Sequence, residues 1–250
     1  SSDSWMLFTR EFYSLVHSKL REDGVFIQWI PIHNLEVYDF TSILKTVRSV
    51  FSNVSLMVTG TYTLVLTKKG KFEKLEIFSK DFGDLKTIGI ADEDTFKSLV
   101  LLSPELFNIL VEREKGEILS DLKSSVEFAE FHRRVAEDTK VKNLKLILKY
   151  STPLELSKFT DTDPKKHYSM ILANTGLVDY WDNLHYEALK KLDKSLELDP
   201  KNFYSRFLFH TIFPNFVELV YKYETQIKER YGEKVYQELV EYIRSKIESK

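Results

Sequence analysis

The feature that most constrains the fold is an apolar run at residues 24–30, which follows an amphipathic stretch. In Gly24-Val25-Phe26-Ile27-Gln28-Trp29-Ile30 the glutamine is the one polar side chain, and Pro31 ends the run. Nearly unbroken apolar runs of this length are typical of strands with parallel neighbours and helices on both faces. Upstream, apolar residues recur at helical spacing from Trp5 to Leu20. We therefore expect a helix followed by a buried strand of an α/β unit.

The next residues continue this pattern. Helical spacing predicts a helix over 38–51, and the runs 54–58 and 62–67 flank Thr59-Gly60-Thr61, which predicts a hairpin. The order helix, strand, helix, strand, strand is typical of the closing half of a doubly wound sheet with an antiparallel edge. The sequence has no glycine-rich strand-to-helix turn, the usual nucleotide-binding element of the opening half. We therefore expect the C-terminal half only, without the opening half in which such folds hold a nucleotide-like ligand.

The rest of the chain is predicted to be mostly helical. After a mixed, charged stretch, residues 92–102 and 104–113 have helical patterns, the second with Ser103 as its N-cap. From about residue 126 helices are expected almost to the end. Breaks are expected near residues 151–153, 161–164, Gly176, Pro200 and Pro214. A change of composition near residue 130 predicts three parts: an α/β core over 1–70, a mixed and helical segment over 71–130, and a helical domain over 131–250.

The helical domain contains one half of a known repeat pattern. Ala188–Leu192 and Ser195–Asn202 resemble the second helix and the turn of a tetratricopeptide repeat. Because fewer than three such units seldom form a stable groove, we expect one helical hairpin packed on its neighbours. The apolar spacing from Val235 to Ile247 predicts an amphipathic last helix that seals this stack or, alternatively, forms a dimer face.

Composition excludes several classes of function. Charged residues make up 30% of the chain, yet its formal net charge is −2, so nucleic acid and acidic lipid are not expected partners. The absence of cysteine excludes disulfides and fits a cytoplasmic chain. His167, His185 and His210 lack metal-ligand spacing. No apolar run approaches the roughly 18 residues of a membrane span.

Two runs near the start carry a family resemblance. Leu7-Phe8-Thr9-Arg10-Glu11-Phe12-Tyr13, followed by Leu20 and by the run from Gly24 to Pro31, resembles the spermidine synthase family and, more narrowly, its spermidine/spermine synthase-related branch. The resemblance continues through further short runs, namely Asp39-Phe40, Ile43-Leu44, Val47, Ser49-Val50-Phe51 and Val54-Ser55-Leu56. A weaker similarity at Ser120-Asp121 and Val126-Glu127-Phe128 extends it to about residue 130.

The resemblance implies a methyltransferase-like (Rossmann) sheet and an aminopropyl transfer. Family members move an aminopropyl group from decarboxylated S-adenosylmethionine, a co-substrate, to an amine of a polyamine. A carboxylate beside that amine positions it and accepts its proton. The resemblance places the main catalytic aspartate before Ser1. Asp3 is a weaker candidate for this role, and capping of the first helix is its alternative.

Three further residues are candidates for substrate binding. The resemblance places Gln28 close to the nucleoside and the amine; the alternative is a glutamine satisfied by loop backbone. Trp29 and His33 follow it, with core packing and simple solvation as their alternatives. No residue of this chain is expected to bind a cofactor or a metal.

Two hypotheses about the whole protein follow. In the first, the intact polypeptide is an aminopropyltransferase with a polyamine substrate, and this chain alone does not turn over. In the second, a degenerate transferase core supports a non-catalytic helical module that binds a protein partner. In both, an uncovered edge of the strand at 24–30 predicts pairing with a second copy and hence a homodimer.

Overall fold

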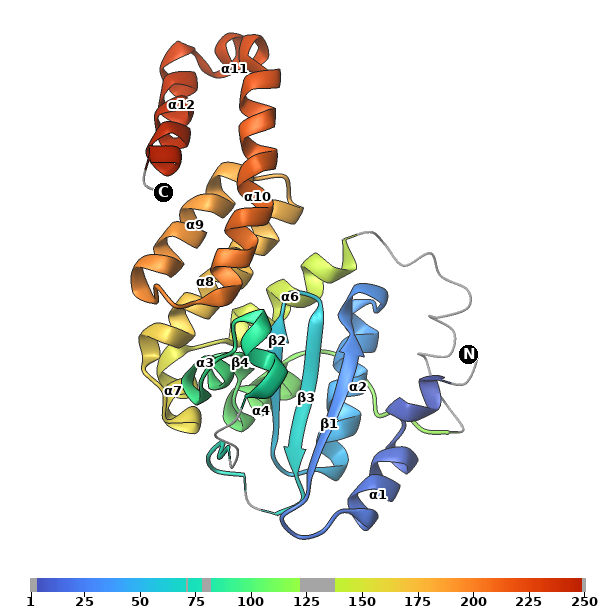
Figure 1. Cartoon of the computed structure of the whole chain (residues 1–250). Coiled ribbons are helices and arrows are strands. Elements are labelled where there is room, and N and C mark those ends of the chain that lie inside the picture. Colours follow the sequence, from blue (N-terminus) through green and yellow to red (C-terminus); the bar gives the residue numbers. More distant parts are fainter. Residues whose placement is uncertain (1–3, 71, 78–81, 122–137, 249–250) are drawn as a thin grey trace.

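The computed structural model describes residues 4–70, 72–77, 82–121 and 138–248, and it combines a small sheet with a helical stack (Figure 1). The strands are β1 (Val25–Pro31), β2 (Val54–Thr59), β3 (Tyr62–Lys68) and β4 (Val100–Leu102). The helical elements before residue 114 are η1 (Ser4–Phe8), α1 (Arg10–Lys19), η2 (Ile32–Asn34), α2 (Val37–Val50), η3 (Gly83–Ile88), α3 (Glu93–Lys97) and α4 (Pro104–Arg113). The later helices are α6 (Thr139–Tyr150), α7 (Pro153–Thr160), α8 (Pro164–Trp181), α9 (His185–Leu198), α10 (Phe203–Lys222), α11 (Glu224–Tyr231) and α12 (Glu233–Glu248).

The sheet has four strands in the order β1-β3-β2-β4, and all neighbours are antiparallel. The predicted hairpin is confirmed, because Thr59 pairs with Tyr62 across the turn. The predicted order from α1 to β3 is confirmed as well. The expectation of parallel neighbours for β1 is wrong for the described residues, since β1 pairs with β3 alone and lies at the sheet edge. β1 and β2 run in the same direction on either side of β3.

Helices cover one face of β1 and leave the other open. Phe26 faces the covered side, where its ring lies 6.3 Å from that of Phe12 on α1 and 6.1 Å from that of Phe51 at the end of α2. Val25, Ile27 and Trp29 point to the opposite side, and their exposed fractions are 51%, 55% and 47%. The expectation of two covered faces is therefore wrong for this strand, because α1 and α2 pack on the same face (Figure 1).

The predicted helix over residues 92–102 is wrong in its second half. Asp92 caps α3 by accepting a hydrogen bond from the Thr95 amide at 2.8 Å, but α3 ends at Lys97. Residues 100–102 instead form β4, which pairs with β2. All three of its side chains are fully buried, and a run buried on both faces suits a strand better than an amphipathic helix. The next helix, α4, begins at Pro104 with Ser103 as its N-cap, as predicted.

Two predicted helix breaks do not occur. α8 continues through Gly176, where a Cβ would lie 3.1 Å from the Ala188 carbonyl oxygen, so the glycine allows α8 and α9 to approach closely. α10 continues through Pro214, and its buried apolar side chains Ile212, Phe213 and Phe216 offset the missing backbone donor. The breaks at residues 151–153, 161–164 and 200 are confirmed. The proposed boundary near residue 130 and the similarity at Val126-Glu127-Phe128 lie outside the described residues.

α8 and α9 pack against each other as a helical pair and α10 packs on α9, which forms a three-helix layer beside the sheet (Figure 1). Asn202 begins α10 as predicted, and its side chain accepts a hydrogen bond from the Ser205 amide at 3.0 Å. The tip of the β2-β3 hairpin contacts this layer, because the Gly60 amide donates to the Asn174 side chain at 3.1 Å. No helix in the described part of the chain is long and apolar enough to span a bilayer.

Candidate functional site

The predicted substrate-binding residues lie on β1 and on the turn η2 that follows it, but they face different sides. Gln28 lies in the middle of β1 and faces the covered side of the sheet with Phe26 and Ile30. Trp29 faces the open side, and His33 lies in the middle of η2. The three candidates lie close together in the sequence. In the folded chain, however, Gln28 lies on the covered side of the sheet, and Trp29 and His33 do not.

Both polar groups of the Gln28 side chain have partners inside the protein. Its Oε1 accepts a hydrogen bond from the Tyr13 hydroxyl at 2.7 Å, and its Nε2 donates to the Leu7 carbonyl oxygen at 2.9 Å. Tyr13 is fully buried, and this burial raises the pKa of its phenol well above the usual range. Gln28 thus ties η1 and α1 to β1, and its contact with a substrate stays a prediction.

Trp29 and His33 form an aromatic pair on the open side. Their ring centroids lie 6.2 Å apart, and 47% of Trp29 is exposed. The His33 Nδ1 is buried and has no hydrogen-bond partner in the described ranges. Ring faces of this kind attract an organic cation within about 6 Å, so the pair offers a surface that a protonated amine can contact.

A distant helix holds the backbone that carries His33. The Asn143 side chain on α6 donates to the carbonyl oxygens of Ile32 and Leu35, at 2.8 and 2.7 Å. The Thr139 hydroxyl donates to the His33 carbonyl oxygen at 2.9 Å. Since three backbone carbonyls of one short turn are satisfied by a single helix, η2 has a fixed shape. The sequence gave no indication of this support, because α6 lies more than a hundred residues downstream.

Other expected groups cannot be placed at this site. Asp3 lies outside the described residues. Within the described ranges, no group of three or more His, Asp or Glu residues is arranged to hold a metal ion. The chemistry available on the described part of β1 and η2 is therefore that of aromatic rings, an imidazole, the engaged amide of Gln28 and the exposed amide of Asn34.

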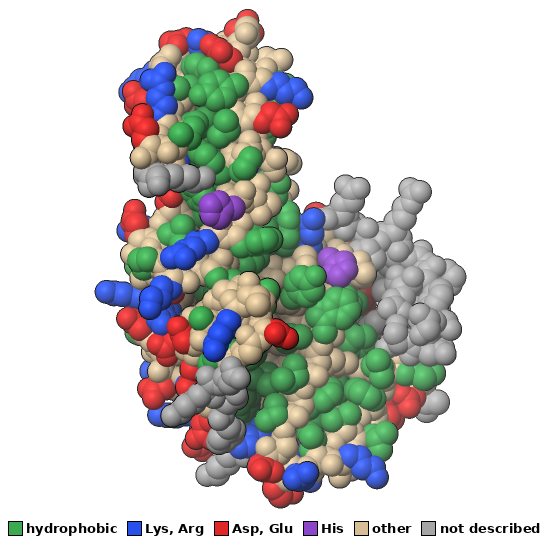
Figure 2. Space-filling view, in the orientation of Figure 1, with side chains coloured by type: hydrophobic (Ala, Val, Ile, Leu, Met, Phe, Trp, Pro, Cys, Tyr) green, Lys and Arg blue, Asp and Glu red, His purple; other side chains and the backbone are tan. Residues whose placement is uncertain are grey.

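A large hollow on the open face of the sheet was not predicted. It is a cavity of about 860 Å³ between the sheet, η3, α8 and α10. Residues from every one of these elements line it, including Ile27, Leu64, Ile88, Trp181, Tyr204 and Phe207. Figure 2 shows hydrophobic side chains gathered over β1 and β3 on this side of the molecule. Sequence reasoning missed the cavity because its walls come from segments far apart in the chain.

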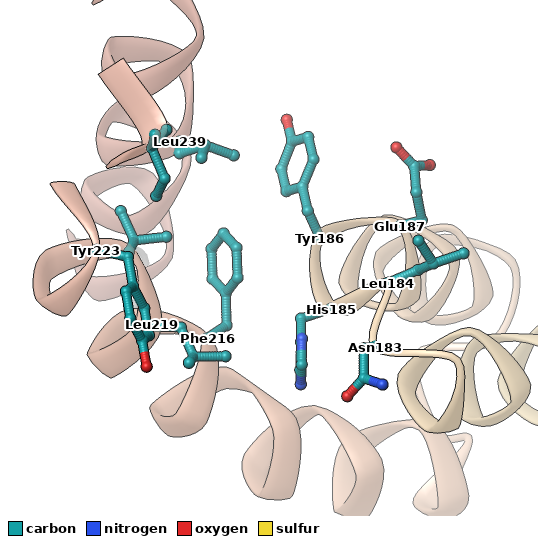
Figure 3. A pocket seen from close by; sticks show the side chains of 11 residues that line it. Asn183, Leu184, His185, Tyr186, Glu187, Phe216, Leu219, Tyr223 and Leu239 are labelled. Atoms are coloured by element: carbon teal, nitrogen blue, oxygen red, sulfur yellow. The ribbon is translucent and has the colours of Figure 1, made fainter. Parts of the chain in front are cut away.

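A second, smaller groove of about 350 Å³ lies in the helical stack (Figure 3). The start of α9 forms one side, and α10 with the following helices forms the other. The rings of Tyr186 and Phe216 stack with centroids 5.9 Å apart inside it. His185, Tyr223 and Leu239 also line the groove. The groove combines apolar rings with few polar groups, which is typical of a surface that contacts another apolar side chain.

Comparison with known proteins gives one match. Residues 1–79 match the family model described as the spermine/spermidine synthase domain. The match covers less than a third of the chain and includes α1, β1, α2, β2 and β3. It supports a relation of this segment to the spermidine synthase family. No curated protein and no solved structure matches the chain, so the repeat-like pattern at Ala188–Asn202 stays a prediction.

Proposed function

We propose that residues 1–79 form part of the transferase domain of an aminopropyltransferase, whose intact form acts on a polyamine. The match of this segment to the spermine/spermidine synthase domain is the observation that carries the proposal. The topology gives further support, because β1 and β2 run in the same direction around the antiparallel β3. Two strands of equal direction followed by an antiparallel strand are what the closing half of a doubly wound sheet was expected to contain.

The proposed reaction is a displacement at carbon. A neutral amine of the polyamine attacks the carbon next to the sulfonium of decarboxylated S-adenosylmethionine. A C–N bond forms, the C–S bond breaks, methylthioadenosine leaves, and the new ammonium loses a proton to a base. Most of the rate comes from holding the two substrates in line. In this proposal Trp29 and His33 contact the cationic part of the polyamine.

The nucleoside needs groups that the described residues do not supply at this site. The exposed apolar residues of β1, and its outer edge, which no described strand covers, suit pairing with further strands of the same sheet. We propose that those strands hold the nucleoside and the catalytic carboxylate, and that the present chain alone does not turn over. A second copy at the same edge is the competing arrangement, and it predicts a homodimer in sedimentation experiments.

The test compares this chain with the complete natural polypeptide. Both receive decarboxylated S-adenosylmethionine with putrescine or spermidine, and methylthioadenosine release is measured. The complete polypeptide should release it, whereas the chain alone should give neither release nor calorimetric heat with methylthioadenosine. A complete polypeptide without turnover on either amine would contradict the proposal.

A matched pair of variants tests the role of the aromatic surface. Trp29→Ala in the complete polypeptide should lower kcat/KM for the polyamine about 2- to 30-fold, the range of a cation–π contact. Tyr62→Ala is the control, because Tyr62 is a more exposed aromatic residue on the same face, at 68%, and is not part of the pair. Equal effects of the two substitutions would exclude a specific contact at Trp29.

The alternative function is a non-catalytic module that binds a protein partner through the helical stack. The aromatic groove between α9 and α10 favours this alternative, because it lies far from β1 along the chain and has apolar walls. The release assay separates the two functions. A complete polypeptide that lacks turnover but loses a partner on Tyr186→Ala would support the binding module.

A further inference from the structure

The cavity on the open face of the sheet has the size and the walls of a ligand site. Its volume of about 860 Å³ lies within the roughly 300–1,000 Å³ of small-molecule pockets. The strands supply Ile27 and Leu64, and the opposite wall consists of Trp181 on α8 and Phe207 on α10. Pockets with mostly apolar walls and a few polar groups are typical binding sites of small apolar molecules. The walls belong to one chain, so a ligand here would be held between the sheet and the helical layer.

The lining sets the charge of the ligand. None of the described residues that line the cavity is an Asp, Glu, Lys, Arg or His. An ion in such surroundings loses its hydration without gaining a partner, which costs several kcal/mol or more. The polyamine of the proposed function carries several positive charges and does not suit these walls. The cavity therefore favours a neutral molecule and is independent of the proposed transfer reaction.

One polar group in the cavity lacks a partner. Tyr204 is 7% exposed, and burial raises the pKa of its phenol. Its hydroxyl has no hydrogen bond to any described residue, and it lies beside the hairpin turn. A Cβ at Gly60 would lie 2.6 Å from the Tyr204 oxygen, so the glycine keeps space open next to it. The Tyr204 oxygen is not one of the fully buried, unpartnered polar atoms of the described chain, so it is accessible from the cavity, and a ligand oxygen can accept its hydrogen bond.

We propose that this cavity binds a neutral, elongated apolar molecule, such as a fatty alcohol or ester, whose oxygen accepts a hydrogen bond from Tyr204. The chain of the ligand lies between the sheet and α10, against Ile27, Leu64 and Phe207. The oxygen lies near the tip of the β2-β3 hairpin. Binding at this place links the sheet to the helical layer, because both contribute walls to the same cavity.

The experiment is calorimetric titration of the purified chain with three ligands of equal length: 1-decanol, sodium decanoate and decylammonium chloride. Decanol should saturate one site per chain. Decanoate and decylammonium should bind at least 10-fold more weakly, because no charged side chain lines the cavity. Equal affinity of the three ligands, or no saturable binding of decanol, would overturn the proposal. A dimer that excludes decanol would overturn it as well.

Two variants place the ligand in the cavity. Tyr204→Phe removes the hydroxyl that has no partner, so the fold should be kept and decanol affinity should fall about 2- to 10-fold, as expected for one hydrogen bond. Tyr168→Phe is the control, since Tyr168 is 45% exposed and outside the cavity. Leu64→Trp should narrow the cavity and also weaken binding, with circular dichroism to verify folding. Unchanged affinity in both Tyr204→Phe and Leu64→Trp would refute the site.

Discussion

The bond between Tyr13 and Gln28 allows a quantitative test of how α1 is held on β1. Gln28→Ala removes the acceptor of a fully buried hydroxyl, at 2.7 Å, together with the donor to the Leu7 carbonyl. A buried donor left unpaired costs about 1–3 kcal/mol. The bond to Leu7 is exposed and adds about 0.5–1 kcal/mol. The substitution should therefore lower the free energy of unfolding by about 1.5–4 kcal/mol.

A double-mutant cycle separates the two bonds. Tyr13→Phe removes the hydroxyl itself, so Gln28→Ala in that background should cost only the bond to Leu7, about 1 kcal/mol. The coupling between the two positions should be about 1–3 kcal/mol. Urea denaturation followed by circular dichroism measures each value, provided that the slope of the transition is unchanged among the variants.

The control for this cycle is a glutamine on the surface. Gln237→Ala removes an exposed amide that donates to Glu233 at 2.7 Å on α12, and it should change stability by less than about 0.5 kcal/mol. If Gln28→Ala costs the same with tyrosine and with phenylalanine at position 13, the hydroxyl is not held by Gln28 in solution. The assigned structural role of Gln28 would then be wrong.

Three further predictions concern stability. Burial lowers the pKa of His167 to about 4. As the pH falls, the unfolded chain therefore binds a proton at this residue before the folded chain does. Stability on the order of 3 kcal/mol should be lost as the pH falls from about 6.5 to 4. His167→Gln should flatten that pH dependence in urea titrations, and an identical pH profile would contradict this. Ser195→Val should lower the free energy of unfolding by about 1–3 kcal/mol, because Ser195 lies in a buried hydroxyl network between α8 and α10. An unchanged urea midpoint would show that water replaces the Ser195 hydroxyl in this network. Gly89→Ala should destabilise more than Gly232→Ala, since both have a φ of +90° but only at Gly89 would a Cβ collide with the Phe203 side chain. Equal shifts of the melting temperature would contradict this contact.

Local patterns predicted most helices and the hairpin correctly, because these depend on neighbours in sequence. Thr59-Gly60-Thr61 fixed a tight turn, and Ser103 and Asn202 capped the helices that follow them. The sequence could not reveal that residues 100–102 form a strand, because their pairing with β2 depends on residues more than forty positions away. Gly176 likewise resembles a helix break until the close approach of Ala188 explains it.

The sequence selected candidate site residues but did not predict how they are arranged, and their role stays a prediction. The resemblance selected Gln28, Trp29 and His33, which are close in sequence. The alternation of side chains along β1 puts Gln28 and Trp29 on opposite faces, and η2 places His33 beside Trp29. A pattern of residue types does not say which face of a strand helices will cover. The cavity beside Tyr204 was not predicted at all, since it exists only where the sheet, η3 and two distant helices meet.

The support of η2 by α6 has a consequence for biosynthesis. Asn143 follows Ile32 by 111 residues, and ribosomes add roughly 5–20 residues per second. The turn that carries His33 therefore emerges about 6–22 s before the helix that supplies its hydrogen-bond donors. During that interval the carbonyl groups of the turn remain hydrated and its shape is not fixed, so the aromatic pair matures only after α6 has been synthesised.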